Sequence, residues 1–555
     1  MSMTLSEEAR QALIDYRNGR LRYEQLPELC ATHIPKVPIV DPENSEALKE
    51  TEAIYLDSAA SAPLLLPPQL LAETLETRYR SNYGRSCGYC EKIIRRGLHR
   101  TRTEALAYFG GAPKDHIVVL GSNTTNLVLI FYQHVLARDA DPHILISRLS
   151  HSAVSMPLRK LSRGTWEYIP LSPCFSLDLD GLETKLKELR RHGSKQLTLV
   201  VETISNVTGY ETEWREVISL AEKYECRVLL DNAQGGPFIE IRLKDYSADV
   251  FVVISGHKMG ARDGSGVLVG PYGLFERELP LQPTAGMILH YTEDREFFLP
   301  PPLTQEYGTP NYIAQASLAE SFRVFSTVGL SRMKEGIRTR TLQLLQHLEA
   351  LDGVKVLGCS KHGHPRYGSV SFVSHGEDGR EIASPAVAAA LSYFHGVQLR
   401  SNHLCAPVYI QALKGIDNQR ANRIAAASFR LVSGRDVKNA FQELQRLDVA
   451  DSGLRSLWVA RPSVGFGTTQ ATVDLFASAL RQVLQKKEYR RLTQVPMVAI
   501  LQAPRGESTF CLDYVPAGLP PQLLRRLVEP ELPEFEIGPG PSEAGEAIRE
   551  IRSNS

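Results

Sequence analysis

The sequence has few cysteines, no long apolar run and no basic leader, and each absence excludes a class of protein. Eight cysteines in 555 residues are too sparse for a disulfide framework, which favours a reducing, cytoplasmic compartment. No stretch approaches the roughly 18 uninterrupted apolar residues that a membrane helix needs. The N-terminus also lacks the basic-then-apolar order of a secretory signal. We therefore expect no association with a membrane.

Excess charge of one sign is also absent. Lys+Arg and Asp+Glu both number 63, so the formal net charge is +0. Such a balance provides no general field for phosphate backbones or anionic lipids. Cys87 and Cys90 are the only close pair of cysteines, and no second pair follows at zinc-like spacing. We expect neither a nucleic-acid partner nor a bound metal.

Short apolar runs alternate with amphipathic stretches between residues 52 and 315. Continuous β-branched runs are typical of a parallel sheet that is covered on both faces. Strand–helix alternation of this kind predicts an α/β fold with a doubly wound domain. The runs lie at residues 116–120, 143–147, 197–201, 227–231, 250–254 and 266–270.

The pattern changes along the chain and predicts four regions. Residues 1–51 are expected to form an N-terminal helical arm, and 52–315 the large domain. Residues 316–486 change to a long helix, strands and a closing amphipathic helix, which indicates a smaller α+β domain. Residues 487–555 form a C-terminal extension with strand-like pieces around Ala499 and Phe510, and its Pro/Gly/Glu-rich end is expected to be mobile.

Polar side chains follow four of the predicted strands, at the point where each strand ends. Ligands of an open parallel sheet bind beyond the carboxyl ends of its strands. An imidazole, an amide, a carboxylate and an amine are therefore expected at one edge. The segments are Ser150-His151, Ser205-Asn206, Asp231-Asn-Ala-Gln234 and Ser255-Gly-His-Lys258, and Gly121-Ser-Asn-Thr-Thr-Asn126 opens a helical run that suits a phosphate.

These groups match what pyridoxal phosphate requires. Its aldehyde needs a lysine amine, its pyridine nitrogen a buried carboxylate, its phosphate hydrogen-bond donors and its ring a flat partner. Taken alone, Lys258 could be a solvated surface charge, Asp231 a helix cap and His151 a satisfied polar residue. The ordered set predicts a cofactor site, whereas no single residue does.

Seven motifs between residues 55 and 485 occur in the order seen in one family. With them the chain resembles the class V aminotransferase and cysteine desulfurase family of fold-type I pyridoxal-phosphate enzymes. The resemblance implies a large domain with a mostly parallel sheet, a smaller α+β C-terminal domain, and a homodimer with active sites at its interface. The motifs are Tyr55-Leu-Asp-Ser-Ala-Ala-Ser-Ala62, Ser150-His-Ser-Ala153, Ser205-Asn-Val-Thr-Gly209, Asp231-Asn-Ala-Gln234, Ser255-Gly-His-Lys258, Gly308-Thr-Pro-Asn311 and Arg461-Pro-Ser-Val-Gly-Phe-Gly-Thr-Thr469.

The resemblance assigns a role to each matched residue. It implies that Lys258 is the Schiff-base lysine, that Asp231 pairs with the pyridinium nitrogen, and that His151 stacks on the ring. The other implied contacts are Asn206 and Gln234 to the phenolic oxygen side, Ser255, His257, Ser122 and Asn123 to the phosphate, Thr309 to a phosphate across the homodimer interface, and Arg461 and Ala59 to the substrate.

Two segments resemble the family's carboxylate-binding arginine segment. Ala426-Ala-Ser-Phe-Arg430 has an alanine where that arginine belongs, whereas the segment that begins at Arg461 has the arginine and is followed by the closing helix. Guanidinium geometry suits a bidentate contact with a carboxylate. We therefore assign the substrate α-carboxylate to Arg461.

The reaction that we expect depends on the role of one cysteine, Cys405. Desulfurases of this family carry a nucleophilic cysteine in an Arg-x-x-His-x-Cys setting, which Arg400-Ser-Asn-His-Leu-Cys405 resembles. The resemblance implies that Cys405 accepts sulfur, with His403 or Arg400 favouring its thiolate. The alternative is that Cys405 only fills space as a small, buried hydrophobic residue. The segment from Cys405 to Arg461 is longer than in typical desulfurases, Asn123 replaces a usual threonine, and Arg262 adds a charge near the site.

The expected function is therefore cleavage of the C–S bond of cysteine or a related β-substituted amino acid, with an amino-acid substrate and a sulfur-acceptor protein as partners. The alternative is another enzyme that uses the same cofactor on another amino acid: a class V aminotransferase, an epimerase or a β-elimination lyase. A third interpretation is a non-catalytic scaffold. The paired Lys258 and Asp231 argue against the scaffold, because a scaffold needs neither residue.

Overall fold

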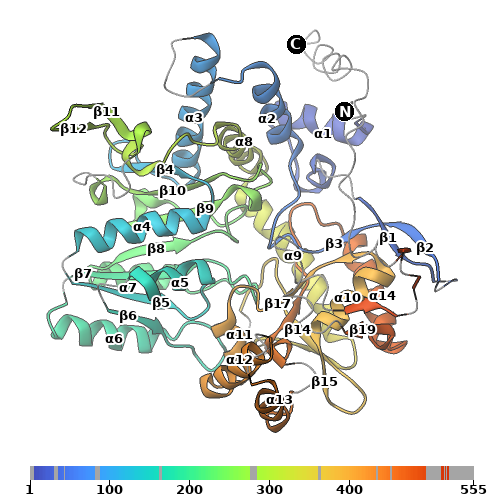
Figure 1. The fold of residues 1–555 in the computed structure, drawn as a ribbon. Helices are drawn as coiled ribbons and strands as arrows, with labels where there is room; N and C mark the ends of the chain where they lie inside the picture. Colours follow the sequence, from blue (N-terminus) through green and yellow to red (C-terminus); the bar gives the residue numbers. More distant parts are fainter. Residues whose placement is uncertain are drawn as a thin grey trace.

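The computed structural model places two α/β units side by side (Figure 1). It describes residues 5–30, 35–42, 44, 46–81, 88–139, 141–161, 165–194, 196–275, 284–359, 364–432, 436–449, 453–494, 514–517, 519–520 and 522–523.

A seven-stranded sheet forms the centre of the large domain, with the strand order β4-β10-β9-β8-β7-β5-β6. Strands β9, β8, β7, β5 and β6 run parallel, while β10 pairs antiparallel with both β4 and β9. The mostly parallel sheet confirms the predicted fold class. The strands are β4 (His116–Gly121), β5 (Pro142–Ser147), β6 (Thr165–Ile169), β7 (Gln196–Glu202), β8 (Arg227–Asp231), β9 (Val250–Ser255) and β10 (Gly266–Pro271).

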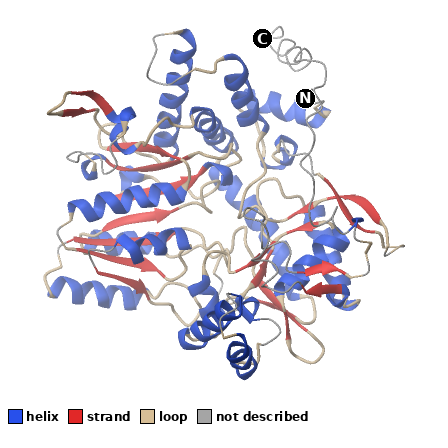
Figure 2. Ribbon diagram, viewed as in Figure 1, coloured by secondary structure: helices blue, strands red, loops and turns tan. Residues whose placement is uncertain are grey.

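The sheet is buried on both faces, as its apolar runs predict. Val118 and Leu120 of β4 belong to one hydrophobic cluster, whereas Ile117 and Val119 belong to another on the opposite face. Successive side chains of a strand point to opposite faces, so a strand between two helical layers must be apolar throughout. Helices surround the sheet in the large domain (Figure 2). They are α2 (Leu66–Arg78), α3 (Tyr89–Tyr108), α4 (Thr124–Arg138), α5 (Ser152–Leu161), α6 (Leu179–Arg191), α7 (Trp214–Lys223) and α8 (Tyr312–Val328).

The second unit is built on a smaller antiparallel sheet of order β13-β14-β18-β17, with β15 paired to β14. The boundary expected at 315/316 falls inside α8, which packs against α2 and α3 of the large domain. Helices α9, α10 and α14 complete the small domain. Its elements are α9 (Leu330–Glu349), β13 (Val354–Val356), β14 (Phe372–His375), β15 (Glu381–Ile382), α10 (Ser384–His395), β16 (Val397–Gln398), β17 (Arg400–Asn402), β18 (Val459–Arg461) and α14 (Gln470–Gln485).

The N-terminal region departs from the predicted helical arm. Residues 7–17 form a helix, α1 (Glu7–Arg17), but β1 (Lys36–Val40) and β2 (Leu48–Glu52) form an antiparallel pair. The β1 strand lies against α10, and β3 (Ile54–Tyr55) pairs with β16. The polar residues of β2 are exposed at an edge, which is why this strand lacks the apolar signal of a core strand.

A helical insertion connects β17 to β18. Its helices α11 (Pro407–Leu413), α12 (Asn418–Val432) and α13 (Val437–Arg446) lie at the bottom of Figure 1. Apolar side chains of α12 and α13, with Trp458, form a separate small core. In the C-terminal extension, β19 (Leu492–Gln494) pairs with β20 (Tyr514–Pro516); the predicted pieces around Ala499 and Phe510 lie outside the described residues.

Two kinds of feature are absent from the described part of the chain. None of its helices is both long and apolar enough to cross a membrane. It also contains no cluster of three or more histidine, cysteine or acidic side chains arranged to hold a metal ion. Cys87, one of the two close cysteines, lies outside the described residues.

Candidate active site

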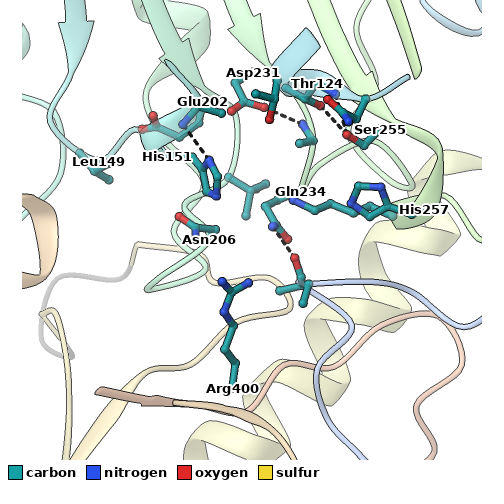
Figure 3. Close-up of a pocket in the computed structure, with 18 of the residues that line it drawn as sticks. Thr124, Leu149, His151, Glu202, Asn206, Asp231, Gln234, Ser255, His257 and Arg400 are labelled. Carbon is teal, nitrogen blue, oxygen red and sulfur yellow. Dashed lines mark hydrogen bonds between the residues drawn. The ribbon is translucent and has the colours of Figure 1, made fainter. Parts of the chain in front are cut away.

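A cavity of about 220 Å³ lies at the carboxyl ends of the parallel strands and reaches the small domain (Figure 3). Both domains contribute to its wall. The structure therefore brings together side chains that are far apart in the sequence. The predicted site residues that line it are Ala59, Asn123, His151, Asn206, Asp231, Gln234, Ser255, His257, Lys258 and Arg461.

Lys258 and Asp231 occupy neighbouring positions of the cavity wall. Lys258 ends a short 3₁₀ turn that follows β9, and Asp231 is the last residue of β8. Burial lowers the pKa of Lys258 to about 8, and the negative charge of Asp231 partly opposes this shift. Burial also raises the pKa of Asp231, against the effect of Lys258. The Asp231 carboxylate accepts a hydrogen bond of 3.0 Å from the Ala233 N–H.

The lowered pKa of Lys258 predicts how the rate of cofactor uptake depends on pH. Only the neutral amine attacks an aldehyde, and its fraction rises with pH until the pH exceeds the pKa. Mixing cofactor-free protein with pyridoxal phosphate in a stopped-flow spectrometer is therefore expected to give a rate that rises up to about pH 8 and then levels off. A rate that keeps rising above pH 10 would indicate an ordinary exposed lysine.

His151 lies at the start of α5, after the turn that leaves β5. Its Nδ1 accepts a hydrogen bond of 3.1 Å from the Ala153 N–H, which fixes the ring. Burial lowers its pKa to about 3, and the positive charges of Lys258 and Arg400 act in the same direction. The imidazole is therefore neutral at physiological pH. A neutral flat ring suits the predicted stacking on the cofactor.

The start of α4 forms the end of the cavity that suits a phosphate. The Asn123 side chain caps the helix by accepting from the Asn126 N–H at 2.9 Å. Thr124 donates its backbone N–H to Ser255 Oγ at 2.8 Å, and its hydroxyl lies 2.8 Å from the same oxygen. The positive end of the helix dipole favours a phosphate here, and the hydroxyls of Thr124 and Ser255 are polar groups beside it. Ser122 does not line the cavity; it is exposed, and its N–H donates to Asn126.

Two amides fix other parts of the wall. Gln234 donates from its side chain to the carbonyl of Ala59 at 2.8 Å, which ties the segment after β3 to the large domain. Asn206 donates to the carbonyl of Leu404 at 2.8 Å. Each amide therefore holds a small-domain or N-terminal loop against the cavity.

Arg400 and Arg461 face the cavity from adjacent strands. Arg400 of β17 lies directly opposite Arg461 of β18. The long insertion between these strands therefore leaves their pairing intact. Arg461 is 1% exposed, and its Nη2 lies 2.5 Å from the carboxylate of Asp57. Ala426, at the alternative arginine position, is exposed on α12. Of the two alternative positions, Arg461 lines the cavity and Ala426 does not.

Cys405 is not among the residues that line the cavity, but it is close enough to act electrostatically on Lys258. The Arg400 Nη2 is 3.4 Å from Cys405 Sγ. His403 instead accepts the Cys405 N–H at its Nδ1, at 3.0 Å. The cysteine and Leu404 both have positive φ angles, 53° and 49°, which are unfavourable for residues with a side chain. Ser152 holds this strained turn by donating its N–H and its hydroxyl to the Cys405 carbonyl, at 2.6 and 2.7 Å.

Some site residues differ from the predicted set. Thr309 is exposed and does not reach the cavity within this chain. Arg400, Thr124, Thr125 and Glu202 line the cavity without having been predicted to do so. Thr124 and Thr125 follow directly after Asn123. The sequence predicts this helix start, but the resemblance assigns phosphate contacts to Ser122 and Asn123 and not to the two threonines. Glu202 gave no signal of its own, because a glutamate that ends a strand is usually solvated.

The fold and this cavity define a fold-type I pyridoxal-phosphate enzyme. The family model for aminotransferase class V matches residues 54–433, which is more than half of the chain, and the chain therefore belongs to that family. Its members use pyridoxal phosphate. The resemblance seen in the motifs is confirmed.

Several curated relatives carry the name cysteine desulfurase or probable cysteine desulfurase. The chain is 26% identical over 405 residues to a probable cysteine desulfurase of Mycobacterium leprae, covering 70% of this chain and 63% of that protein. It is 27% identical over 363 residues to a cysteine desulfurase of Synechococcus elongatus, covering 64% of this chain and 54% of that protein. The chain thus matches somewhat over half the length of each.

Solved structures share the fold. A cysteine desulfurase from Thermococcus onnurineus aligns with a TM-score of 0.62 at 22% identity, covering 78% of this chain and 95% of that chain. A cysteine desulfurase from Escherichia coli aligns with a TM-score of 0.60 at 19% identity, covering 78% of this chain and 95% of that chain. At these identities the likeness establishes the architecture.

The side chains present fit pyridoxal phosphate. The cavity offers a buried amine of lowered pKa, a buried carboxylate, a neutral imidazole and a helix N-terminus flanked by hydroxyls. Lys258 would hold the aldehyde carbon, Asp231 the ring nitrogen, and Thr124 with Ser255 the phosphate. When bound, this cofactor supplies an electron sink for negative charge at the substrate Cα.

Proposed function

We propose that this protein is a cysteine desulfurase, which moves sulfur from cysteine, or from a related β-substituted amino acid, onto Cys405. The observation that carries the proposal is the position of the cysteine. Its Sγ touches the guanidinium of Arg400, a residue that lines the cofactor cavity. Side chains of the cavity region, Asn206 and Ser152, hold its turn. A cysteine that only fills space needs no such support.

The residues of the chain divide the work as follows. Arg461 binds the substrate carboxylate, and Asp57 orients its guanidinium. Lys258 moves the proton at the substrate Cα. The Cys405 thiolate attacks the substrate sulfur: the Cβ–S bond breaks, an S–S bond forms, and Cβ takes up a proton. Cysteine and the enzyme thiol thereby become alanine and an enzyme persulfide, with atoms and electrons in balance.

A β-elimination lyase is the second candidate. Cys405 is not among the residues that line the cavity, and an elimination needs Lys258 without any thiol. The products separate the two reactions. Holoprotein given L-cysteine and a thiol reductant is expected to form alanine and sulfide in equal amounts. Pyruvate and ammonia with little alanine would establish elimination and contradict the desulfurase proposal.

We also infer a homodimer with active sites at its interface. The hairpin of β11 (Ile288–Tyr291) and β12 (Glu296–Phe298) stands away from the body at the upper left of Figure 1. It exposes Leu289 by 71%, Tyr291 by 68% and Phe297 by 42%, and clustered exposed apolar side chains favour a protein interface. Thr309 is exposed, as a residue that serves a partner's phosphate would be.

The dimer predicts a definite result for the hairpin. Leu289→Glu with Tyr291→Glu is expected to convert the protein to monomer in light scattering, because two charges cannot be buried unpaired. The cofactor affinity should fall with it, because Thr309 of the second copy is lost. A matched change on the exposed face of α14, Leu475→Glu, should leave the dimer intact. A monomeric wild-type protein would contradict the inference.

Two coarser inferences accompany the function. A persulfide on Cys405 must be passed on, so we propose a sulfur-acceptor protein as a partner. The sparse cysteines support a reducing, cytoplasmic location. Fractionation of the source cells, with an antibody against the chain, tests that location.

A further inference from the structure

Glu202 is a buried carboxyl group in the cavity wall that the proposed reaction does not use. It ends β7, is 4% exposed and lies beside Asp231 as its register partner on β8. No lysine or arginine pairs with it in the described part of the chain. Burying a carboxyl group is costly unless hydrogen bonds satisfy it, so the burial of Glu202 calls for a physical reason.

Its two oxygens bind two serines that flank one turn. Ser147, the last residue of β5, donates its hydroxyl to Glu202 Oε1 at 2.8 Å. Ser150, which immediately precedes His151, donates to Oε2 at 2.9 Å. Ser147 Oγ also accepts the Leu149 N–H at 3.1 Å. One carboxyl group therefore spans the turn from the end of the strand to the residue next to His151.

We propose that Glu202 is a positioning residue that clamps the 147–151 turn and so holds His151 in the cofactor cavity. Figure 3 shows Glu202 and His151 on the same side of the cavity, opposite His257 and Ser255. The inference rests on the proposed cofactor site. It adds a residue that acts through the turn before His151.

The electrostatics of Glu202 reflect its burial. Burial raises the pKa of Glu202 to about 7, the serine hydroxyls oppose that shift, and the nearby Asp231 charge adds to it. A carboxyl group that serves as an acid or a cation partner would be expected to contact the reacting atoms or a positive side chain. Glu202 instead contacts the hydroxyls of Ser147, at the end of β5, and Ser150, in the turn that follows.

The sharpest test is a double-mutant cycle with His151. Glu202→Ala is expected to lower kcat about 10- to 100-fold with little change in KM, since displacement of a positioned group by about 1 Å can cost that much. It should also weaken the visible circular dichroism of the bound cofactor. In a His151→Ala background the same change should cost almost nothing, because the group that Glu202 positions is already absent.

Three further variants guard against a folding effect. Ser147→Ala with Ser150→Ala removes the clamp from the other side and should reproduce the loss. Glu202→Gln can still bond to both hydroxyls and should recover much of the activity. Glu167→Ala, on the neighbouring strand β6 with a 41% exposed side chain, should match the wild type.

The outcomes separate this proposal from the proposed function. Equal losses from Glu202→Ala in both backgrounds would overturn the clamp, as would a Gln variant as impaired as the Ala variant. If wild-type protein binds no cofactor, the proposed function fails. The clamp is then judged on cofactor-free protein by the NMR resonance of the His151 imidazole, which Glu202→Ala must shift and Glu167→Ala must not; an unshifted resonance overturns it.

Discussion

Lys258→Ala is expected to abolish turnover, with a loss of roughly 10³-fold or more. The substitution removes both the amine that holds the cofactor and the group that moves the proton at Cα, and general acid–base catalysis alone is worth about 10² to 10⁴. The variant should still fold, because the cavity around it is polar and open enough to admit water. Borohydride treatment followed by dialysis should leave the cofactor on the wild-type protein and none on the variant.

The matched control is Lys244→Ala. Lys244 is an exposed lysine of the large domain, and its loss should change neither turnover nor the borohydride result. If Lys258→Ala retains a borohydride-fixed cofactor, another lysine holds the aldehyde and the assignment of the site fails. If it retains turnover at the wild-type rate, the reaction does not use this cavity.

Cys405→Ser is expected to lower alanine formation at least about 10²-fold while the cofactor spectrum stays unchanged. Serine nearly preserves the shape of the cysteine but is a far weaker nucleophile at neutral pH, so the loss reports the attack on sulfur rather than binding. Cofactor binding should persist, because Cys405 lies outside the cavity wall. Rates of alanine and pyruvate formation, measured with the same holoprotein, give the result.

Arg400→Lys provides an intermediate case, and Cys90→Ser the control. A lysine keeps the positive charge but loses the guanidinium contact with Cys405 Sγ, so alanine formation should fall less than in Cys405→Ser. Cys90, a partly exposed cysteine on α3, should be dispensable. Unchanged alanine formation in Cys405→Ser would reject the persulfide and leave only chemistry that needs no thiol.

The sequence predicts the sheet and the main cofactor groups because both depend on local patterns. The β-branched runs that became β4, β5, β7, β8, β9 and β10 are unmistakable where both faces are buried. Parallel strands end at one edge, so His151, Asp231 and Lys258 had to converge there. The strand β6 was missed because Thr165-Trp-Glu-Tyr-Ile169 is an edge strand with half-buried side chains.

Other features depend on contacts between distant parts of the chain. Residues 36–40 and 48–52 form strands because they pair with each other and because β1 lies against α10. The pairing of Arg400 with Arg461 across β17 and β18 is hidden by the inserted helices α11–α13. The role of Glu202 depends on hydrogen bonds from Ser147 and Ser150, which lie more than 50 residues earlier in the sequence. Periodicity and motifs report none of these contacts.

The most direct test of the account is the mass of the Cys405 peptide after a brief exposure of holoprotein to L-cysteine. Rapid quenching with an alkylating reagent, digestion without reductant and mass spectrometry would measure it. The account predicts one added sulfur atom on that peptide in the wild type and none in Lys258→Ala. An unmodified Cys405 peptide beside accumulating pyruvate would contradict it.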